Sequence, residues 1–351
     1  MQRLVVLFTG GTIASAFGEG GGKGPDSTVV GALRDHLTGF FAGRDVDVIC
    51  REPWGVPGLD SSDLDPGHWV ELASSIAIEL ENGATGFLIL HGTDTMAYTS
   101  AWLSLCFPHV DVPIVLTGSQ LTLDYMPEDV TVNLRGAAQV AFSDISGVWI
   151  YCNWKLIPGN RAHKAQALHP DAYVATNGQP MYFNPEWARK DRKGTVRQPL
   201  SHTLSPLAEK AMGHGPDVAR NIGSRMAWLF CTPGFSPRLS GEERVLAILG
   251  YGAGNAPSGA LHAVERAFDG LPKPHVIACS QAEGDMKNPG SYAGVGIASL
   301  ADRGFTVWSQ MDYPVEFIHA LGCYSLLASS SAPGFVLSHY LRECSSETPL
   351  L

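Results

Sequence analysis

Residues 4–14 read LVVLFTGGTIA, an apolar run that ends in two glycines and a threonine. Short runs rich in β-branched residues are typical of strands that are buried on both faces of a sheet. A glycine pair lets the backbone turn sharply directly after such a strand. The stretch therefore predicts a buried strand followed by a tight turn, at which Thr12 presents a hydroxyl group.

Similar apolar runs recur along the chain and predict further strands. They lie at 46–49, 86–90, 114–117 and 148–151, and again at 226–230, 245–249, 276–278 and 305–308. Helical patterns separate them, near 65–82, 94–105, 129–142, 258–268 and 314–328. In the clearest case Asp65 and Pro66 are suited to begin the helix, and Asn82-Gly83 to end it. Alternating strands and helices predict an α/β fold with parallel sheets.

The length of the chain favours two domains, because 351 residues exceed the usual domain size of roughly 100 to 200. Between about 176 and 225 the alternation breaks, and Asn, Gly, Pro and charged residues dominate. We expect a larger N-terminal catalytic domain with a parallel sheet and flanking helices over 1–200. An irregular linker would cover 201–225, and a smaller C-terminal α/β domain 226–351.

The composition excludes several classes of function. Hydrophobic residues make up 45% and charged residues 17%, and the net charge of −10 would repel a phosphate backbone, so nucleic acid is not expected as a partner. The sequence has no run of about 18 apolar residues, which argues against a membrane span. Seven widely spaced cysteines without a CxxC pattern and the lack of a secretory leader favour the cytoplasm.

Four polar segments lie where a ligand would bind in such a fold, close to the carboxyl ends of strands. They are 9–14, 60–63, 91–96 and 159–164. The hydroxyl groups and amides of Ser61 and Ser62 can bind a carboxylate. Thr93 and Asp94 begin a helix whose free amides favour negative charge, and Lys164 could act as a base in a partly buried loop. Each segment alone could equally be a turn, a helix cap or a solvated lysine, but together they supply the parts of an acyl-transfer site.

The same segments resemble a known family. Residues 9–14 resemble the first signature of the bacterial-type L-asparaginases and 90–96 the second, and the likeness extends through 60–69, 117–120, 160–164 and 250–257. Details such as 60–63 are most similar to the cytoplasmic type I enzymes. The resemblance implies hydrolysis of the side-chain amide of L-asparagine through a threonine acyl-enzyme. It also implies a homodimer or homotetramer that acts on a small molecule.

Roles for individual residues follow from the resemblance alone. Thr12 would be the nucleophile, and Thr93, Asp94 and Lys164 would form the second catalytic group. The expected substrate-binding residues are Gly11, Asp60, Ser61, Ser62, Gly92 and Ser119, with Asp129 supporting the Ser119 turn. Asp94 and Ser61 would grip the α-amino and α-carboxylate groups, Ser119 would lie by the leaving ammonia, and Asn255 would serve the site of a neighbouring subunit.

One departure concerns the lid of the site. The family places a tyrosine a little over ten residues beyond the first threonine, whereas 16–28 is rich in glycine and holds none. Lys23, Tyr125 or water could assist Thr12 instead, and these alternatives stay open. The histidines lack metal-ligand spacing, and 250–254 lacks the last glycine of a dinucleotide fingerprint, so we predict neither metal nor nicotinamide.

Two other functions remain compatible with the sequence. One is the amidase subunit of a tRNA-dependent amidotransferase. The other, motivated by the absent lid tyrosine, is a non-catalytic or altered-specificity homologue that binds an amino acid. The sequence also leaves open the choice between asparagine and glutamine, because one methylene changes pocket affinity by only roughly 1 to 3 kcal/mol.

Overall fold

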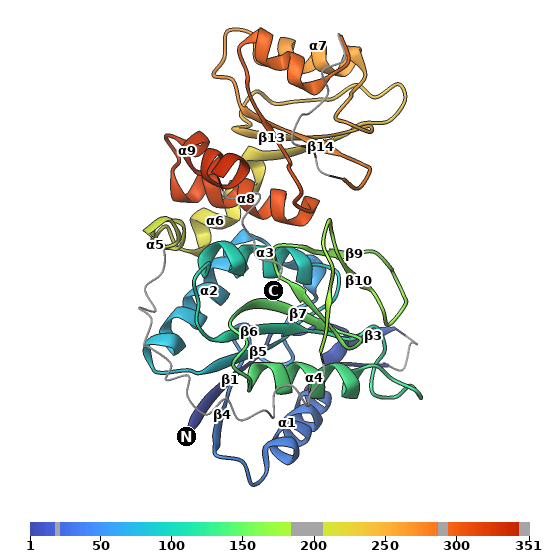
Figure 1. Ribbon diagram of the computed structural model, residues 1–351, viewed down its shortest axis with the longest axis vertical. Helices are drawn as coiled ribbons and strands as arrows, with labels where there is room; N and C mark the ends of the chain where they lie inside the picture. Colours follow the sequence, from blue (N-terminus) through green and yellow to red (C-terminus); the bar gives the residue numbers. More distant parts are fainter. Residues whose placement is uncertain (18–21, 184–205, 285, 287–293, 344–351) are drawn as a thin grey trace.

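The structure, a computed structural model, describes residues 1–17, 22–183, 206–284, 286 and 294–343. Figure 1 shows its layers stacked along the long axis of the molecule. A large sheet lies between α1 and α4 on one face and α2 and α3 on the other, and a smaller sheet lies beyond a layer that contains α8 and α9. This is the predicted α/β architecture of a larger N-terminal part and a smaller C-terminal part.

The large sheet has seven strands, of which the five that were predicted run parallel. In spatial order the strands are β4 (Val46–Arg51), β1 (Gln2–Phe8), β5 (Gly86–Leu90), β6 (Pro113–Thr117), β7 (Gly147–Cys152), β8 (Lys155–Pro158) and β11 (Met181–Tyr182). The last two extend the sheet antiparallel to β7 and β8, respectively. Strand β1 lies between β4 and β5, so the turns after β1 and β5 emerge side by side at one edge.

Both faces of the large sheet are covered by helices, which explains its continuous apolar strands. Alternate residues of β1 enter different cores: Val5 and Leu7 pack with α2 (Pro66–Glu81) and α3 (Met96–Cys106), whereas Val6 packs with α1 (Ser27–Phe41) and α4 (Val130–Ala141). The predicted ends of α2 are confirmed, with Asp65 as a capping box and Asn82 as the C-cap. Helix α1 was not predicted from the sequence.

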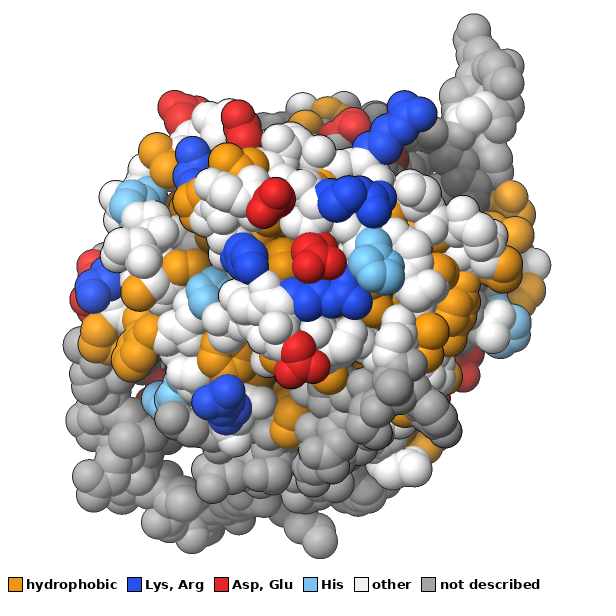
Figure 2. All heavy atoms as spheres, turned by 90° about the horizontal axis from the view of Figure 1, so that it is seen from above, with side chains coloured by type: hydrophobic (Ala, Val, Ile, Leu, Met, Phe, Trp, Pro, Cys, Tyr) orange, Lys and Arg blue, Asp and Glu red, His pale blue; other side chains and the backbone are white. Residues whose placement is uncertain are grey.

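The smaller sheet consists of four parallel strands, all of them predicted. They are β12 (Met226–Phe230), β13 (Val245–Gly250), β14 (His275–Ser280) and β15 (Thr306–Ser309). One face packs against α7 (Ser258–Ala267) and the 3-10 helix η5 (Ile297–Arg303). Figure 2 shows acidic and basic side chains interspersed on the end of the molecule that α7 covers. Arg303 of η5 pairs with Glu265 of α7 at 2.9 Å.

The other face of the smaller sheet packs on α8 (Val315–Ala328), followed by α9 (Pro333–Ser338) and the short helix η6 (His339–Glu343). All residues of α8 from Glu316 to Ala328 except His319 are buried. The helix also contacts α3 of the large unit, where the rings of Trp102 and Tyr324 meet edge to face at 5.7 Å. One apolar core therefore extends from the large sheet through α8 to the smaller sheet.

The expectation of an irregular segment up to residue 225 was wrong for its described part. Two short helices, α5 (Pro206–Gly213) and α6 (Pro216–Ile222), lie there and bury small alanines such as Ala208 and Ala219. Arg220 on α6 donates to Glu71 on α2 at 2.7 Å. Glycine and proline separate helices too short to show a clear apolar period, so the sequence resembled a loop. The domain boundaries themselves stay a prediction.

Two small hairpins complete the part that concerns the site. The expected lid begins as β2 (Ser15–Phe17) paired with β3 (Lys23–Pro25); residues 18–21 and the side chain of Lys23 lie outside the described part. The second hairpin pairs β9 (Ala162–Lys164) with β10 (Tyr173–Ala175). Within the described residues, none of the helices has the length and apolar character needed to cross a membrane.

Candidate active site

The two Gly-Thr turns lie in direct contact at the carboxyl ends of β1 and β5. Gly11 has φ +84°, and a Cβ atom placed on it would lie 2.1 Å from the Cα atom of Gly92. Only glycine permits this approach, because an L side chain would both clash and adopt a disfavoured conformation. The partly buried Thr12, which opens the 3-10 helix η1 (Thr12–Ala14), and the buried Thr93 thus follow two touching residues.

The segment 59–63, which contains Ser61, contacts both turns. The backbone amide of Gly11 donates to the carbonyl of Leu59 at 3.1 Å, which joins the first turn to the loop after β4. Asp60 then caps the 3-10 helix η2 (Ser61–Asp63) by accepting from the Ser62 amide at 2.8 Å. A Cβ atom on Gly92 would lie 2.5 Å from Ser61 Oγ, so the Ser61 hydroxyl group lies against the second turn.

Lys164 joins the cluster from the β9–β10 hairpin. Its Nζ atom donates to Thr93 Oγ1 at 2.9 Å and to Asp94 Oδ1 at 2.6 Å, and its side chain is only 16% exposed. Lys164 is therefore not a solvated surface lysine. Asp94 is 62% exposed, and its second oxygen lies 3.5 Å from Ser62 Oγ. A polar atom of a ligand could reach this carboxylate from solvent.

Two residues without an expected role hold the Thr93 turn. Tyr173 on β10 donates its hydroxyl proton to the carbonyl of Thr93. His91 is fully buried, donates from Nδ1 to the Gly92 carbonyl at 2.7 Å and contacts Thr99 Oγ1 through Nε2 at 3.0 Å. Burial lowers the pKa of His91 to about 4, so its imidazole is neutral at pH 7. No sequence motif points to Tyr173. It lies beside Lys164 because β10 pairs with β9 in the hairpin.

The turn after β6 lies on the other side of Thr93. A Cβ atom on Gly118 would lie 2.4 Å from the His91 carbonyl oxygen and 3.1 Å from Thr93 Cγ2. Ser119 is buried, and its hydroxyl group has no hydrogen-bond partner among the described residues. Gln120 and Leu121, which follow Ser119, donate their backbone amides to the Asp129 carboxylate at 2.9 Å each. Burial raises the pKa of the Asp129 carboxyl group.

The structure thus gathers most of the expected site residues and leaves one apart. Those that form the cluster around the two turns are Gly11, Thr12, Asp60, Ser61, Ser62, Gly92, Thr93, Asp94, Ser119 and Lys164. Asn255 belongs instead to the loop after β13, where its amide donates to the Tyr251 carbonyl at 2.9 Å. Its buried Oδ1 atom has no partner among the described residues.

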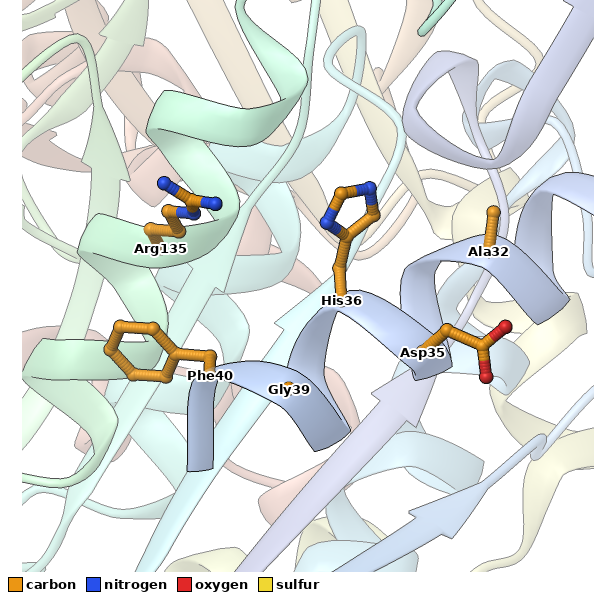
Figure 3. A pocket seen from close by; sticks show the side chains of 6 residues that line it. All are labelled: Ala32, Asp35, His36, Gly39, Phe40 and Arg135. Carbon is orange, nitrogen blue, oxygen red and sulfur yellow. The ribbon is translucent and has the colours of Figure 1, made fainter. Parts of the chain in front are cut away.

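A groove of about 530 Å³ lies elsewhere, between α1 and α4. Figure 3 shows its lining residues, Ala32, Asp35, His36, Gly39, Phe40 and Arg135. None of the expected site residues lines it. In the described ranges, no three His, Cys, Asp or Glu side chains come close enough to hold a metal ion.

Comparison with known proteins assigns this arrangement to a family. A family model described as "Asparaginase, N-terminal" matches residues 3–190. The L-asparaginase of Thermococcus kodakarensis is 30% identical over 285 residues, which is 80% of this chain and 80% of that protein. L-asparaginase 1 of Escherichia coli K12 is 30% identical over 307 residues, with 83% of each chain covered.

Solved structures agree with these matches. The thermostable L-asparaginase from Thermococcus kodakarensis superimposes with a TM-score of 0.72 and 26% identity, over 99% of both chains. Some relatives are longer than the matched part: the chain spans 46% of the L-asparaginase of Dirofilaria immitis. It also spans 52% of a glutamyl-tRNA(Gln) amidotransferase component from Methanosphaera stadtmanae, to which it is 30% identical over 248 residues.

Proposed function

The chain belongs to the asparaginase family and is an asparaginase-type amidohydrolase, and from this premise we propose that it hydrolyses L-asparagine to L-aspartate and ammonia. The contact of Lys164 Nζ with both Thr93 and Asp94, beside the Gly11–Gly92 contact, carries the proposal. It places a hydroxyl group, an amine and a carboxylate in one cluster, next to the turn that bears a second hydroxyl group.

In the proposed reaction the Thr12 hydroxyl oxygen attacks the carbon of the side-chain amide. The hydroxyl proton leaves as the new C–O bond forms. The tetrahedral intermediate then collapses with cleavage of the C–N bond, and the nitrogen takes up a proton and leaves as ammonia, with an ester on Thr12. Water then attacks this ester, which releases aspartate and restores the hydroxyl group. A threonine hydroxyl is a poor nucleophile until a neighbour accepts its proton. Thr93 and Lys164 would take up the proton that the attacking group gives up and pass it to the departing nitrogen.

The remaining residues would bind the two ends of the substrate. Asp94 is exposed enough to accept from the α-amino group, and Ser61 lies close enough to Gly92 to meet the α-carboxylate at the same edge. Ser119 supplies a buried hydroxyl group without a described partner, which suits contact with the departing ammonia. A polar group without a partner is costly to bury, so a bound ligand would relieve that cost.

The position of Asn255, in the loop after β13, suggests how copies of the chain assemble. Asn255 carries a buried oxygen without a described partner in a part of the fold away from the Lys164 cluster. We therefore propose that the chain forms a homo-oligomer in which this loop serves a neighbouring site. Cytoplasm is the proposed compartment, because the six described cysteines are free and five of them are buried.

A second candidate function is the amidase component of an amidotransferase, which the match to the Methanosphaera stadtmanae protein favours. Such a component would pass ammonia to a partner protein instead of releasing it. The two candidates differ in a simple observation: the isolated chain either turns over free asparagine at a substantial rate or requires a second, copurifying protein.

The central test is ammonia release from asparagine and from glutamine by native enzyme and by Thr12→Ala and Thr12→Ser. We expect Thr12→Ala to lose at least about 10³-fold in kcat, because the acyl-enzyme cannot form, and Thr12→Ser to retain part of it. The control is Thr306→Ala, at an exposed position of β15 in the smaller sheet. Full turnover by Thr12→Ala would refute the assigned nucleophile.

A further inference from the structure

Strand β9 lies between the candidate site and helix α8, and its alternate residues face different partners. Successive side chains of a strand point to opposite faces. Lys164 reaches Thr93 and Asp94, whereas Arg161 and His163, which share the opposite face, contact the segment at the start of α8. The segment at the start of α8, in the smaller C-terminal part of the fold, thus contacts the face of β9 opposite to the proposed base.

The first of these contacts joins Arg161 to the residues just before α8. Arg161 donates to the carbonyl of Asp312 at 2.7 Å, pairs with its carboxylate at 2.9 Å and lies over the ring of Tyr313 at 4.8 Å. Asn177, two residues beyond β10, donates to the same carbonyl at 3.0 Å. Both ends of the hairpin therefore contact one short segment of the smaller unit.

The second contact lies directly beside Lys164. His163 Nδ1 is 2.8 Å from Glu316 Oε1, in the first turn of α8. The Glu316 side chain is only 6% exposed, and its Oε2 atom has no partner among the described residues. Burying a carboxylate is costly unless it is paired, so the imidazole of His163 is the group that makes this placement tolerable.

The surroundings determine how the pair responds to pH. The hydrogen bond to Glu316 raises the pKa of His163 above its ordinary 6.5, burial opposes this, and the charges of Glu316 and Glu283 add to it. Burial and, to a smaller extent, the charge of Glu316 raise the pKa of Tyr98 on α3 and of Tyr173 on β10. The ion pair is fully formed below the ordinary pKa of histidine, and it is lost as pH rises through the raised value.

We propose that His163 and Glu316 form a positioning pair, which couples helix α8 to strand β9 and so fixes the Lys164 amine between Thr93 and Asp94. The inference rests on the proposed function for the role of Lys164. Neither residue would touch substrate. A shift of β9 that loosens the pair moves Lys164 as well, because the two residues are neighbours on one short strand. The smaller unit would thereby act on the site of its own chain.

The kinetic test compares Glu316→Gln, which keeps the shape and removes the charge, with His163→Asn, which keeps a donor near the Nδ1 position but cannot titrate. We expect Glu316→Gln to lower kcat roughly ten- to a hundredfold with KM within about twofold, since misplacing a catalytic group costs rate more than binding. His163→Asn should lose less rate. Its kcat profile should lack the inflection that we expect of native enzyme as pH rises through the raised pKa of His163.

The matched control is Glu243→Gln, another buried carboxylate of the smaller unit, which accepts from the amides of Ser240 and Gly241 at 2.9 Å. It should change thermal stability but neither kcat nor the pH profile. A Glu316→Gln enzyme with native kcat and native pH profile would overturn the positioning role, whatever its melting temperature. If Glu316→Gln fails to fold, the pH profile of His163→Asn decides the question in the same way.

A readout that needs no turnover separates this inference from the proposed function. The ¹³Cε resonance of Lys164 can be assigned by its absence in Lys164→Met. We expect the resonance to move in Glu316→Gln and to stay unchanged in Glu243→Gln. Should native protein release no ammonia while the resonance responds, the proposed function fails and the coupling stands. An unmoved resonance in folded Glu316→Gln contradicts the coupling.

Discussion

The two turns of the candidate site are held in place in different ways. Thr93 is fixed by side chains, because Lys164 contacts its hydroxyl group, Tyr173 contacts its carbonyl and His91 contacts the residue before it. The turn of Thr12 is instead fixed through backbone, by the contact of Gly11 with Gly92 and the hydrogen bond to Leu59. Substitution of a side chain that contacts Thr93 should therefore lower catalysis, whereas substitution of Gly11 should disturb the geometry of the Thr12 turn.

The largest effect should come from Lys164→Met, which removes one of the side chains that fix the Thr93 turn. We expect kcat for asparagine to fall roughly 10²- to 10⁴-fold, as for the loss of a general base. Stability should change little, since an ion pair with the exposed Asp94 contributes only about 0 to 1 kcal/mol. Ammonia release and thermal melting measure the two quantities.

A suitable control for this experiment is Lys210→Met, at an exposed position of α5. It removes the same charge without touching the cluster and should leave kcat unchanged. Native turnover by Lys164→Met would show that the amine takes no part in the reaction.

Gly11→Ala should disturb the turn of Thr12, which is fixed through backbone contacts. Its new Cβ atom would lie 2.1 Å from Gly92 Cα at φ +84°, so steric overlap and backbone strain add to a loss of roughly 2 to 5 kcal/mol. Gly43→Ala is the matched control, because Gly43 has φ +76° but nothing within 4 Å of the added atom. It should lose only about 1 to 2 kcal/mol. Urea unfolding of both variants tests the difference, and equal losses would mean that the close approach of the turns is unimportant.

The smallest effect concerns pH and sharpens the description of the Thr93 turn. Burial lowers the pKa of His91 to about 4, so between pH 6.5 and 4 the unfolded chain binds a proton that the folded chain does not. The contribution is complete above pH 6.5 and is lost as pH falls, by roughly 3 kcal/mol in total. We expect His91→Gln to show a shallower loss of unfolding free energy between pH 7 and pH 4. Parallel curves for native protein and variant would contradict a neutral buried imidazole.

Local sequence signals were sufficient for much of the fold. The predicted strands of both sheets are short runs that are mostly apolar, and α2 carries a cap at each end. The Gly-Thr turns follow strands, so the parallel topology alone brings Gly11 and Gly92 to one edge. Such features depend on neighbours in sequence or on a regular period, both of which can be read without coordinates.

Other features depend on contacts between distant positions. Glu316 lies 153 residues beyond His163, and Tyr173 lies 80 residues beyond Thr93. The three residues of β9 are too few to show an alternating pattern, so nothing in the sequence separates the partners of Lys164 from those of His163. The two short helices α5 and α6 were missed for a related reason, since packing rather than local preference stabilises them.

The burial of α8 also bears on how the molecule unfolds. With one side of this helix on the smaller sheet and the other on α3, the two sheets have a common interior. A chain cut near residue 225 would expose the rings of Trp102 and Tyr98 to water, so the remaining fragment would aggregate or be degraded. Heating should accordingly melt both sheets in a single cooperative transition, although strands and helices alternate in two separate stretches of the sequence.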